Sequence, residues 1–366
     1  MELNGVIRTD RAMSDGRTIR YYDSKPVKRE AVDQRPQEEQ PGIGELRFDS
    51  LVNEWVAISA HRQNRVFLPP KELCPLCPTI SSELLTEIPE AEYEVVVFDN
   101  KSPSLRPPIG DSALPDYAGP ETDMGKAIGK CEVIVFNSDH GQSFAQLTNA
   151  QVRTLLEAWR DRTAELSKES FIRHIAPFEN RGEEIGVTLH HPHGQIYAYS
   201  YLPPRVEKML SAAERYQKEF GKNLFDETLK RELNDKSRIV AKNEHWVAFV
   251  PYAARYPFEI HLAPLAHVAD LTELSTEQCD AYPEIALEVM RRLDGVFGIS
   301  MAYIAAWHQA PVREGRDLLR LHWQITSVRR APGKLKYLAG SESAMGAFIM
   351  DVTPEQSAEQ LRAVKL

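Results

Sequence analysis

The chain has 366 residues, of which 42% are hydrophobic and 27% are charged, and its formal net charge at pH 7 is −9. These values are typical of a globular protein of about two domains with a sizeable core, and they exclude collagen, coiled-coil and wholly disordered chains. The acidic balance argues against nucleic-acid binding, although a local basic pocket could hold a small anion. The apolar runs are far shorter than the roughly 20 residues of a membrane span. The N-terminus carries no apolar stretch typical of a secretory signal, so we expect a cytoplasmic protein without a membrane partner.

The N-terminal residues 1–43 are polar and contain three prolines, and we expect them to form an arm outside the core. Alternating or continuous apolar patterns predict strands at 45–49, 54–58, 93–98 and 131–136. A segment rich in Pro, Gly and Asp predicts a loop from 105 to 125. Apolar residues spaced three and four apart predict an amphipathic helix from Thr148 to Ser167.

The chain contains an internal repeat. Residues 131–140 align without a gap on residues 258–267, and each segment is followed by a predicted helix. Further along, His193-Gly-Gln-Ile resembles His322-Trp-Gln-Ile. Two similar units therefore stand in tandem.

The repeat also predicts the fold class and the domain organisation. Short strands followed by single helices predict an α+β fold, with a mainly antiparallel sheet and helices packed on one side. We place a first domain at 44–220 and a second domain at 221–366, after the N-terminal arm.

A Cys-Pro-Leu-Cys segment places Cys74 and Cys77 at a spacing that lets both sulfurs bind one metal ion. The same spacing serves redox chemistry, but a redox pair usually opens a helix, whereas the flanking prolines here predict a loop. Two cysteines complete half of a tetrahedral site, and His140 and His191 are candidates for the other half. The alternative is a pair of buried free thiols.

Three histidines lie together in Leu189-His-His-Pro-His-Gly-Gln-Ile-Tyr197. On a strand, His191 and His193 would point to the same face. Neutral imidazole is a good nucleophile, so one histidine could bind metal while its neighbour attacks an electrophile. Gln195 can donate a hydrogen bond to a negatively charged oxygen without supplying a proton. Alternatively, all three histidines are metal ligands or ordinary loop residues.

Other segments carry weaker signals of phosphate binding. The stretch from Asn180 to Thr188 combines two glycines with polar side chains and could form a turn of backbone donors, or an ordinary hairpin loop. Arg62, Arg65 and Lys336 could neutralise phosphate, or could lie on a solvated face.

These motifs, taken in order, resemble the galactose-1-phosphate uridylyltransferase family of the histidine-triad superfamily. The resemblance runs from about Glu45 to the C-terminus and is carried by Cys74-x-x-Cys77, Ser138-Asp-His140, Asn180-x-Gly, His191-Pro-His-Gly-Gln195 and Lys336-Tyr-Leu-Ala-Gly340-Ser-Glu342. It implies a fold of two tandem histidine-triad-like units. It also implies exchange of UDP-glucose and galactose 1-phosphate for UDP-galactose and glucose 1-phosphate, by ping-pong kinetics. His193 would be the nucleophile that forms a uridylyl-histidine, and Gln195 would hold the phosphoryl oxygens.

The resemblance further implies a structural zinc ion and a homodimer with shared active sites. The zinc would be bound by Cys74, Cys77, His140 and His191, and it would position the nucleophile's strand. The segment from Lys336 to Glu342 would reach into the neighbouring subunit's site. The implied substrate-binding residues are Arg62, Arg65, Asn100, Asn180, Gly186, Thr188, Lys336, Gly340 and Glu342.

One feature departs from the family pattern. Some members hold a second, iron site with three histidines and a glutamate. Here His308 and His322 match two of the histidines, but Gln324 stands at the third position, and Met209 aligns with the glutamate more directly than Glu207 does. This argues against an iron site. The alternative functions are a nucleotide-sugar phosphorylase or adenylyltransferase that uses inorganic phosphate, and a non-catalytic, zinc-stabilised nucleotide-binding protein.

Overall fold

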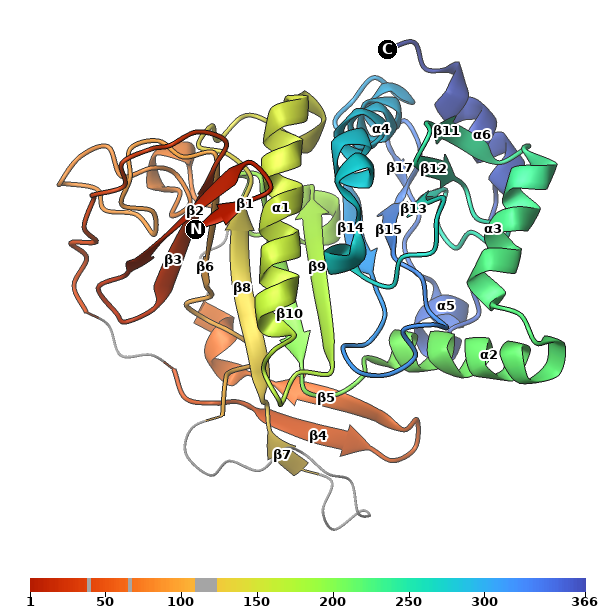
Figure 1. Ribbon diagram of the computed structural model, residues 1–366, viewed down its shortest axis with the longest axis horizontal. Coiled ribbons are helices and arrows are strands. Elements are labelled where there is room, and N and C mark those ends of the chain that lie inside the picture. Colours follow the sequence, from red (N-terminus) through yellow and green to blue (C-terminus); the bar gives the residue numbers. More distant parts are fainter. Residues whose placement is uncertain (38–40, 65–67, 109–123) are drawn as a thin grey trace.

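A large antiparallel sheet runs through the whole molecule (Figure 1). The computed structural model describes residues 1–37, 41–64, 68–108 and 124–366. Twelve strands within these residues form the sheet. From one edge to the other they are β1 (Glu2–Leu3), β2 (Val6–Ala12), β3 (Thr18–Asp23), β6 (Val95–Asp99), β8 (Gly129–Val135), β10 (His193–Tyr199), β9 (His174–Arg181), β14 (Tyr303–His308), β15 (His322–Ser327), β13 (Phe258–Pro264), β12 (Trp246–Phe249) and β11 (Ile239–Lys242).

The two units predicted by the internal repeat form the two halves of this sheet. Strands β8, β10 and β9 of the first half correspond to β13, β15 and β14 of the second. The halves meet where β9 pairs with β14, with Phe178 opposite Ala306. In the first half α1 (Asn149–Leu166) follows β8, and in the second α4 (Thr276–Gly295) follows β13. The predicted α+β class with a mainly antiparallel sheet is confirmed, whereas the domain boundary after residue 220 stays a prediction.

The two helices begin in the same way, because the sequence repeats the same capping signal. Thr148 and Gln151 form a capping box at the start of α1, and Ser275 and Gln278 form one at the start of α4. Each box satisfies backbone donors that the first helical turn would otherwise leave unpaired. The helix predicted from Thr148 to Ser167 is confirmed.

The main core lies between one face of the sheet and these two helices. Trp159 of α1 packs there with Trp307 of β14 and Trp323 of β15. The helix α3 (Leu224–Asp235) packs on the other face, where its Leu229 contacts Val247 and Phe249 of β12. The prediction of helices on one side therefore holds for α1 and α4 and is wrong for α3.

The expectation that residues 1–43 lie outside the core is wrong for the first part of this stretch. Strands β1 to β3 extend the sheet beyond β6, and Tyr22 is fully buried. The stretch looks polar in sequence because it places charged side chains in the interior together with their partners. Arg8 of β2, for example, is buried and lies 2.8 Å from the carboxylate of Asp161 in α1.

The remaining elements surround the sheet. A small sheet contains β5 (Glu54–Ile58), β4 (Glu45–Asp49) and β7 (Met124–Lys126), and a two-stranded ribbon contains β16 (Arg329–Ala331) and β17 (Lys334–Leu335). The other helices are α2 (Pro204–Phe220), α5 (Gly340–Met345) and α6 (Pro354–Ala363). Most of the predicted loop from 105 to 125 lies outside the described residues. Among the described helices, none combines the length and the apolar character needed to cross a bilayer.

Candidate active site and metal centre

A cavity of about 610 Å³ opens where β10 begins and β9 ends. Its walls come from the loop after β8, the loop between β9 and β10, and the C-terminal end of α4. His193, the first residue of β10, lines this cavity. Both units of the chain therefore contribute to the cavity that contains the predicted nucleophile.

The imidazole of His193 is held by a backbone contact. Its Nδ1 lies 2.7 Å from the carbonyl oxygen of His191, so Nδ1 donates a hydrogen bond to this oxygen. The lone pair of the neutral ring then resides on Nε2. Burial lowers the pKa of His193, and the bond to the His191 carbonyl opposes this effect. At neutral pH the ring is therefore suited to attack an electrophile through Nε2.

Gln195 lies on the same face of β10 as His193, because side chains two residues apart on a strand point the same way. Tyr197 continues this row, and its hydroxyl lies 3.4 Å from Nη1 of Arg62. The same Arg62 nitrogen donates to the carbonyl of Ser102 at 2.9 Å. The structure thus brings Arg62 next to the row that contains the predicted nucleophile and its glutamine.

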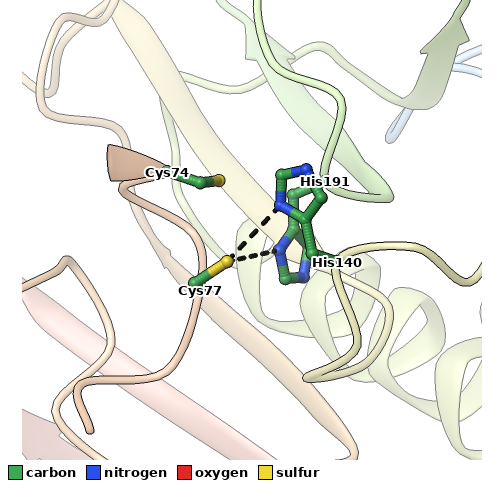
Figure 2. Close-up of side chains that lie close together, drawn as sticks. All are labelled: Cys74, Cys77, His140 and His191. Atoms are coloured by element: carbon green, nitrogen blue, oxygen red, sulfur yellow. Dashed lines mark hydrogen bonds between the residues drawn. The ribbon is translucent and has the colours of Figure 1, made fainter. Parts of the chain in front are cut away.

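The four predicted metal ligands converge in space (Figure 2). One ligand atom from each of Cys74, Cys77, His140 and His191 lies within 4.8 Å of the others. Cys77 Sγ lies 3.4 Å from Nδ1 of His140 and 3.5 Å from Nδ1 of His191. A tetrahedral zinc ion with ordinary Zn–S and Zn–N bonds would hold sulfur and nitrogen roughly 3.6 Å apart. The donor set and its spacing therefore fit a single tetrahedral metal ion.

The surroundings orient His191 for this role. Its Nε2 lies 2.9 Å from the carbonyl oxygen of Asn137 and 3.2 Å from the hydroxyl of Tyr93, which leaves Nδ1 to face the cysteines. Burial lowers the pKa of His191 to about 4, which favours the neutral form that binds metal. Burial raises the pKa of the Cys77 thiol to about 12, and neighbouring Cys74 adds to the effect. A cation is therefore needed to stabilise the Cys77 thiolate at neutral pH.

The other predicted binding residues lie at different distances from the cavity. Asn180 of β9 lines it directly, and the loop that contains Gly186 and Thr188 borders it through Val187. Asn100 follows β6 and is linked to the neighbouring strand, because its backbone N–H donates to the carbonyl of Cys131. Asn180 and this loop thus belong to the cavity of His193, whereas Asn100 lines a separate cavity together with Lys130.

The remaining predicted binding residues do not meet this cavity within one chain. Arg65 lies outside the described residues. No described residue that lines the cavity comes from the segment 336–342. In that segment Lys336 forms an ion pair with Glu342 and donates to the carbonyl of Ile349 at 2.7 Å. Gly340 begins the short helix α5 beside this ion pair.

The histidines of the second unit form a different arrangement from the metal quartet. The rings of His308 and His322 stack at 4.9 Å, and the amide of Gln324 donates to the carboxylate of Glu259 at 2.7 Å. Within the described part of the chain, the metal quartet is the one group of three or more His, Cys, Asp or Glu whose ligand atoms cluster closely. With Gln324 bonded to Glu259 at the third position, the residues present do not fit the iron site that some family members hold.

Sequence reasoning missed one part of the cavity. Arg181 at the end of β9 forms an ion pair with Asp294 of α4 at 3.0 Å, and both residues line the cavity. Glu179 of the same strand also lines the cavity; it is buried and accepts a hydrogen bond from the hydroxyl of Tyr303 at 2.9 Å. No short motif marks this group, because its members come from both units.

Comparisons with known proteins agree with these observations. The family profile described as "Galactose-1-phosphate uridyl transferase, N-terminal domain" matches residues 35–203, and the corresponding C-terminal domain matches residues 209–366. The chain is 40% identical to the galactose-1-phosphate uridylyltransferase of Streptomyces lividans, over 98% of both chains. It is 36% identical to that of Thermotoga maritima, over 88% of this chain and 99% of the relative.

A solved structure described as a uridylyltransferase superposes with a TM-score of 0.76. It is 31% identical and covers 87% of this chain and 97% of its own. Two matched domain profiles, close relatives over the full length and the same fold lead to one conclusion: the chain belongs to the galactose-1-phosphate uridylyltransferase family.

Proposed function

We propose that this chain exchanges UDP-glucose and galactose 1-phosphate for UDP-galactose and glucose 1-phosphate, through a covalent uridylyl-histidine at His193. The observation that carries this proposal is the hydrogen bond from Nδ1 of His193 to the His191 carbonyl, which leaves the lone pair on Nε2 of a residue that lines the cavity. Membership of the family supports the overall reaction.

The chemistry proceeds in two displacements at one phosphorus atom. Nε2 of His193 attacks the α-phosphorus of UDP-glucose, a nitrogen–phosphorus bond forms, and the bond to glucose 1-phosphate breaks with the electron pair leaving on that phosphate. The phosphate oxygen of galactose 1-phosphate then attacks the same phosphorus, and the nitrogen–phosphorus bond returns its pair to Nε2. The His191 carbonyl stabilises the positive charge on the uridylylated ring through Nδ1–H. Both substrates use one nucleophile in turn, which gives ping-pong kinetics.

Gln195 completes this site in our proposal. Its amide N–H donates to a non-bridging oxygen of the transferred phosphoryl group, where negative charge changes during each displacement. An amide does not titrate, so it offers no proton and no base that would favour attack by water. Asn180 and the loop with Gly186 and Thr188 bind the nucleotide and its phosphates at this cavity, and Asn100 contributes from the separate cavity that it lines.

We further propose that Cys74, Cys77, His140 and His191 hold a zinc ion with a structural role. Such an ion supplies a fixed anchor for the segment before β10. Because His191 supplies both a ligand nitrogen to the metal and the carbonyl that orients His193, metal binding sets the ring position of the nucleophile.

The proposal includes a cytoplasmic homodimer with shared active sites, in which the segment from Lys336 to Glu342 serves the neighbouring subunit. Its support is the family resemblance and the exposure of the middle of this segment, residues 337–340, where Tyr337 is 77% exposed. Mixing two inactive variants tests this: subunits of His193→Ala and Glu342→Ala should restore activity when they form mixed dimers. Activity that never returns in verified mixed dimers would contradict the shared site.

Intact-protein mass spectrometry after incubation with UDP-glucose alone tests the central proposal. We expect a mass gain of one uridylyl group that is absent in His193→Ala and disappears when galactose 1-phosphate is added. An adduct that only inorganic phosphate removes would favour the phosphorylase. Metal-loaded protein that forms no adduct and shows no turnover would favour a non-catalytic nucleotide-binding protein.

A further inference from the structure

The hairpin formed by β2 and β3 lies outside the matched family profile, which begins at residue 35, yet it packs against the metal-binding loop. Met13, Ile19 and Tyr21 of the hairpin share a buried hydrophobic cluster with Cys74, Leu76, Ile88 and Tyr93. One predicted metal ligand and its neighbours therefore share a hydrophobic cluster with this N-terminal addition to the sheet.

Arg17, near the tip of this hairpin, reaches two segments of the candidate site at once. Its Nη2 lies 2.6 Å from the carboxylate of Glu87, and its Nη1 donates to the backbone carbonyl of Asp99 at 2.8 Å. Its Nε forms a third bond, to Asp15 at 2.7 Å within the hairpin. The side chain is almost fully buried, so these contacts hold it in one position.

Both segments lead to residues of the proposed site. The backbone N–H of Glu87 donates to the carbonyl of Pro75, which lies between the two cysteines. Asp99 is the last residue of β6 and precedes Asn100, a predicted nucleotide-binding residue. Arg35 also forms an ion pair with Glu87, so two arginines from the N-terminal region neutralise this one carboxylate.

We propose that Arg17 is a positioning residue that fixes the metal-binding loop relative to the end of β6. The guanidinium is suited to this role, because its planar fork can bond a carboxylate and a carbonyl simultaneously. A lysine can retain the charge but not both contacts. The expected effect of Arg17 on metal retention depends only on metal binding by the two cysteines and two histidines. Its expected effect on substrate binding depends also on the proposed function.

A matched arginine on the same hairpin separates this role from a general contribution to stability. Arg8 of β2 is similarly buried and forms ion pairs with Asp10, Asp161 and Glu165. Its partners belong to β2 and α1, away from the metal-binding loop. Arg8→Gln should therefore destabilise the fold without loosening that loop.

The experiment compares Arg17→Gln, Arg17→Lys and Arg8→Gln in the full chain loaded with zinc. We expect Arg17→Gln to release zinc to a chromogenic chelator roughly tenfold faster, as for other residues that orient metal ligands indirectly. Amide hydrogen exchange should accelerate in residues 71–78, and KM for UDP-glucose should rise more than kcat falls. Arg17→Lys should give an intermediate result, and Arg8→Gln should match the wild type in all three measurements.

Equal zinc release and equal exchange in Arg17→Gln and Arg8→Gln would overturn the proposal. Should Arg17→Gln not fold, Glu87→Gln tests the same link from the loop side and should give the same accelerated exchange. A wild-type chain without transferase activity would refute the proposed function, but the exchange and zinc measurements would still decide the role of Arg17.

Discussion

The buried carboxyl of Glu179 gives the molecule a pH-dependent stability that a single substitution should remove. Burial raises the pKa of Glu179 to about 8, from an ordinary value of 4.5. The hydroxyl of Tyr303 donates to Oε1, whereas Oε2 has no hydrogen-bond partner among the described residues. Glu179→Gln keeps the shape and the acceptor oxygen, and it removes the ionisation.

The sign follows from which state binds the proton. Between pH 4.5 and about 8 the folded protein keeps the proton on Glu179, whereas the unfolded chain releases it. The folded state binds more protons in this window, so stability falls as pH rises, by up to about 1.4 kcal/mol per pH unit. From pH 5 to pH 8 the loss from this one group amounts to about 3 kcal/mol.

Denaturant unfolding of the wild type and of Glu179→Gln, at pH 5, 6, 7 and 8 with zinc in excess, measures this effect. The wild type should lose about 3 kcal/mol of unfolding free energy relative to the variant between pH 5 and pH 8, because other titrating groups cancel in the comparison. A difference between the two proteins that stays constant across this range would refute the argument, since it would mean that Glu179 is ionised in the folded state.

Three further predictions concern the site and the core. His193→Ala should abolish transfer while metal content, measured by elemental analysis, stays normal; joint loss of zinc and solubility would mean that His191 and His193 have exchanged roles. Cys74→Ser should lower the midpoint of thermal unfolding and reduce activity through that loss, because metal binding contributes to folding; unchanged stability with full metal content would contradict the ligand assignment. Arg162→Met should cost about 3–5 kcal/mol in denaturant unfolding, because it leaves the buried Glu132 carboxylate without the two 2.8 Å bonds that it now accepts. Adding Glu132→Leu to Arg162→Met should recover much of this loss, and no recovery would point to packing instead of charge as the cause.

The strands and helices that occur in both units could be predicted well from the sequence, because each unit contains its own local signals. The strand around Cys131 and the helix after Thr148 have clear apolar periods and a capping box, and both recur in the second unit. The N-terminal strands were missed for a physical reason. Their buried faces include arginines such as Arg8, whose acidic partner Asp161 lies 153 residues away. Composition alone therefore predicts that such a stretch is exposed to solvent.

The residues of the candidate site likewise fall into those that the sequence predicts and those that only the structure reveals. The metal quartet could be predicted because each ligand belongs to a short motif, and the structure brings all four together. The ion pair between Arg181 and Asp294 could not be predicted, because it joins the end of β9 to the end of α4 across the two units. Arg17 likewise has no motif, and only its contacts with Glu87 and Asp99 reveal it.

The pairing of β9 with β14 at the centre of the sheet has a consequence for the independence of the two units. A strand at a sheet edge exposes unpaired backbone groups and invites aggregation, and β14, Tyr-Ile-Ala-Ala-Trp-His, contains no proline, lysine, arginine or acidic residue to prevent this. Each unit shields the exposed edge of the other. Separating the two units would open this edge on both, so each half of the sheet depends on the other to pair its backbone groups.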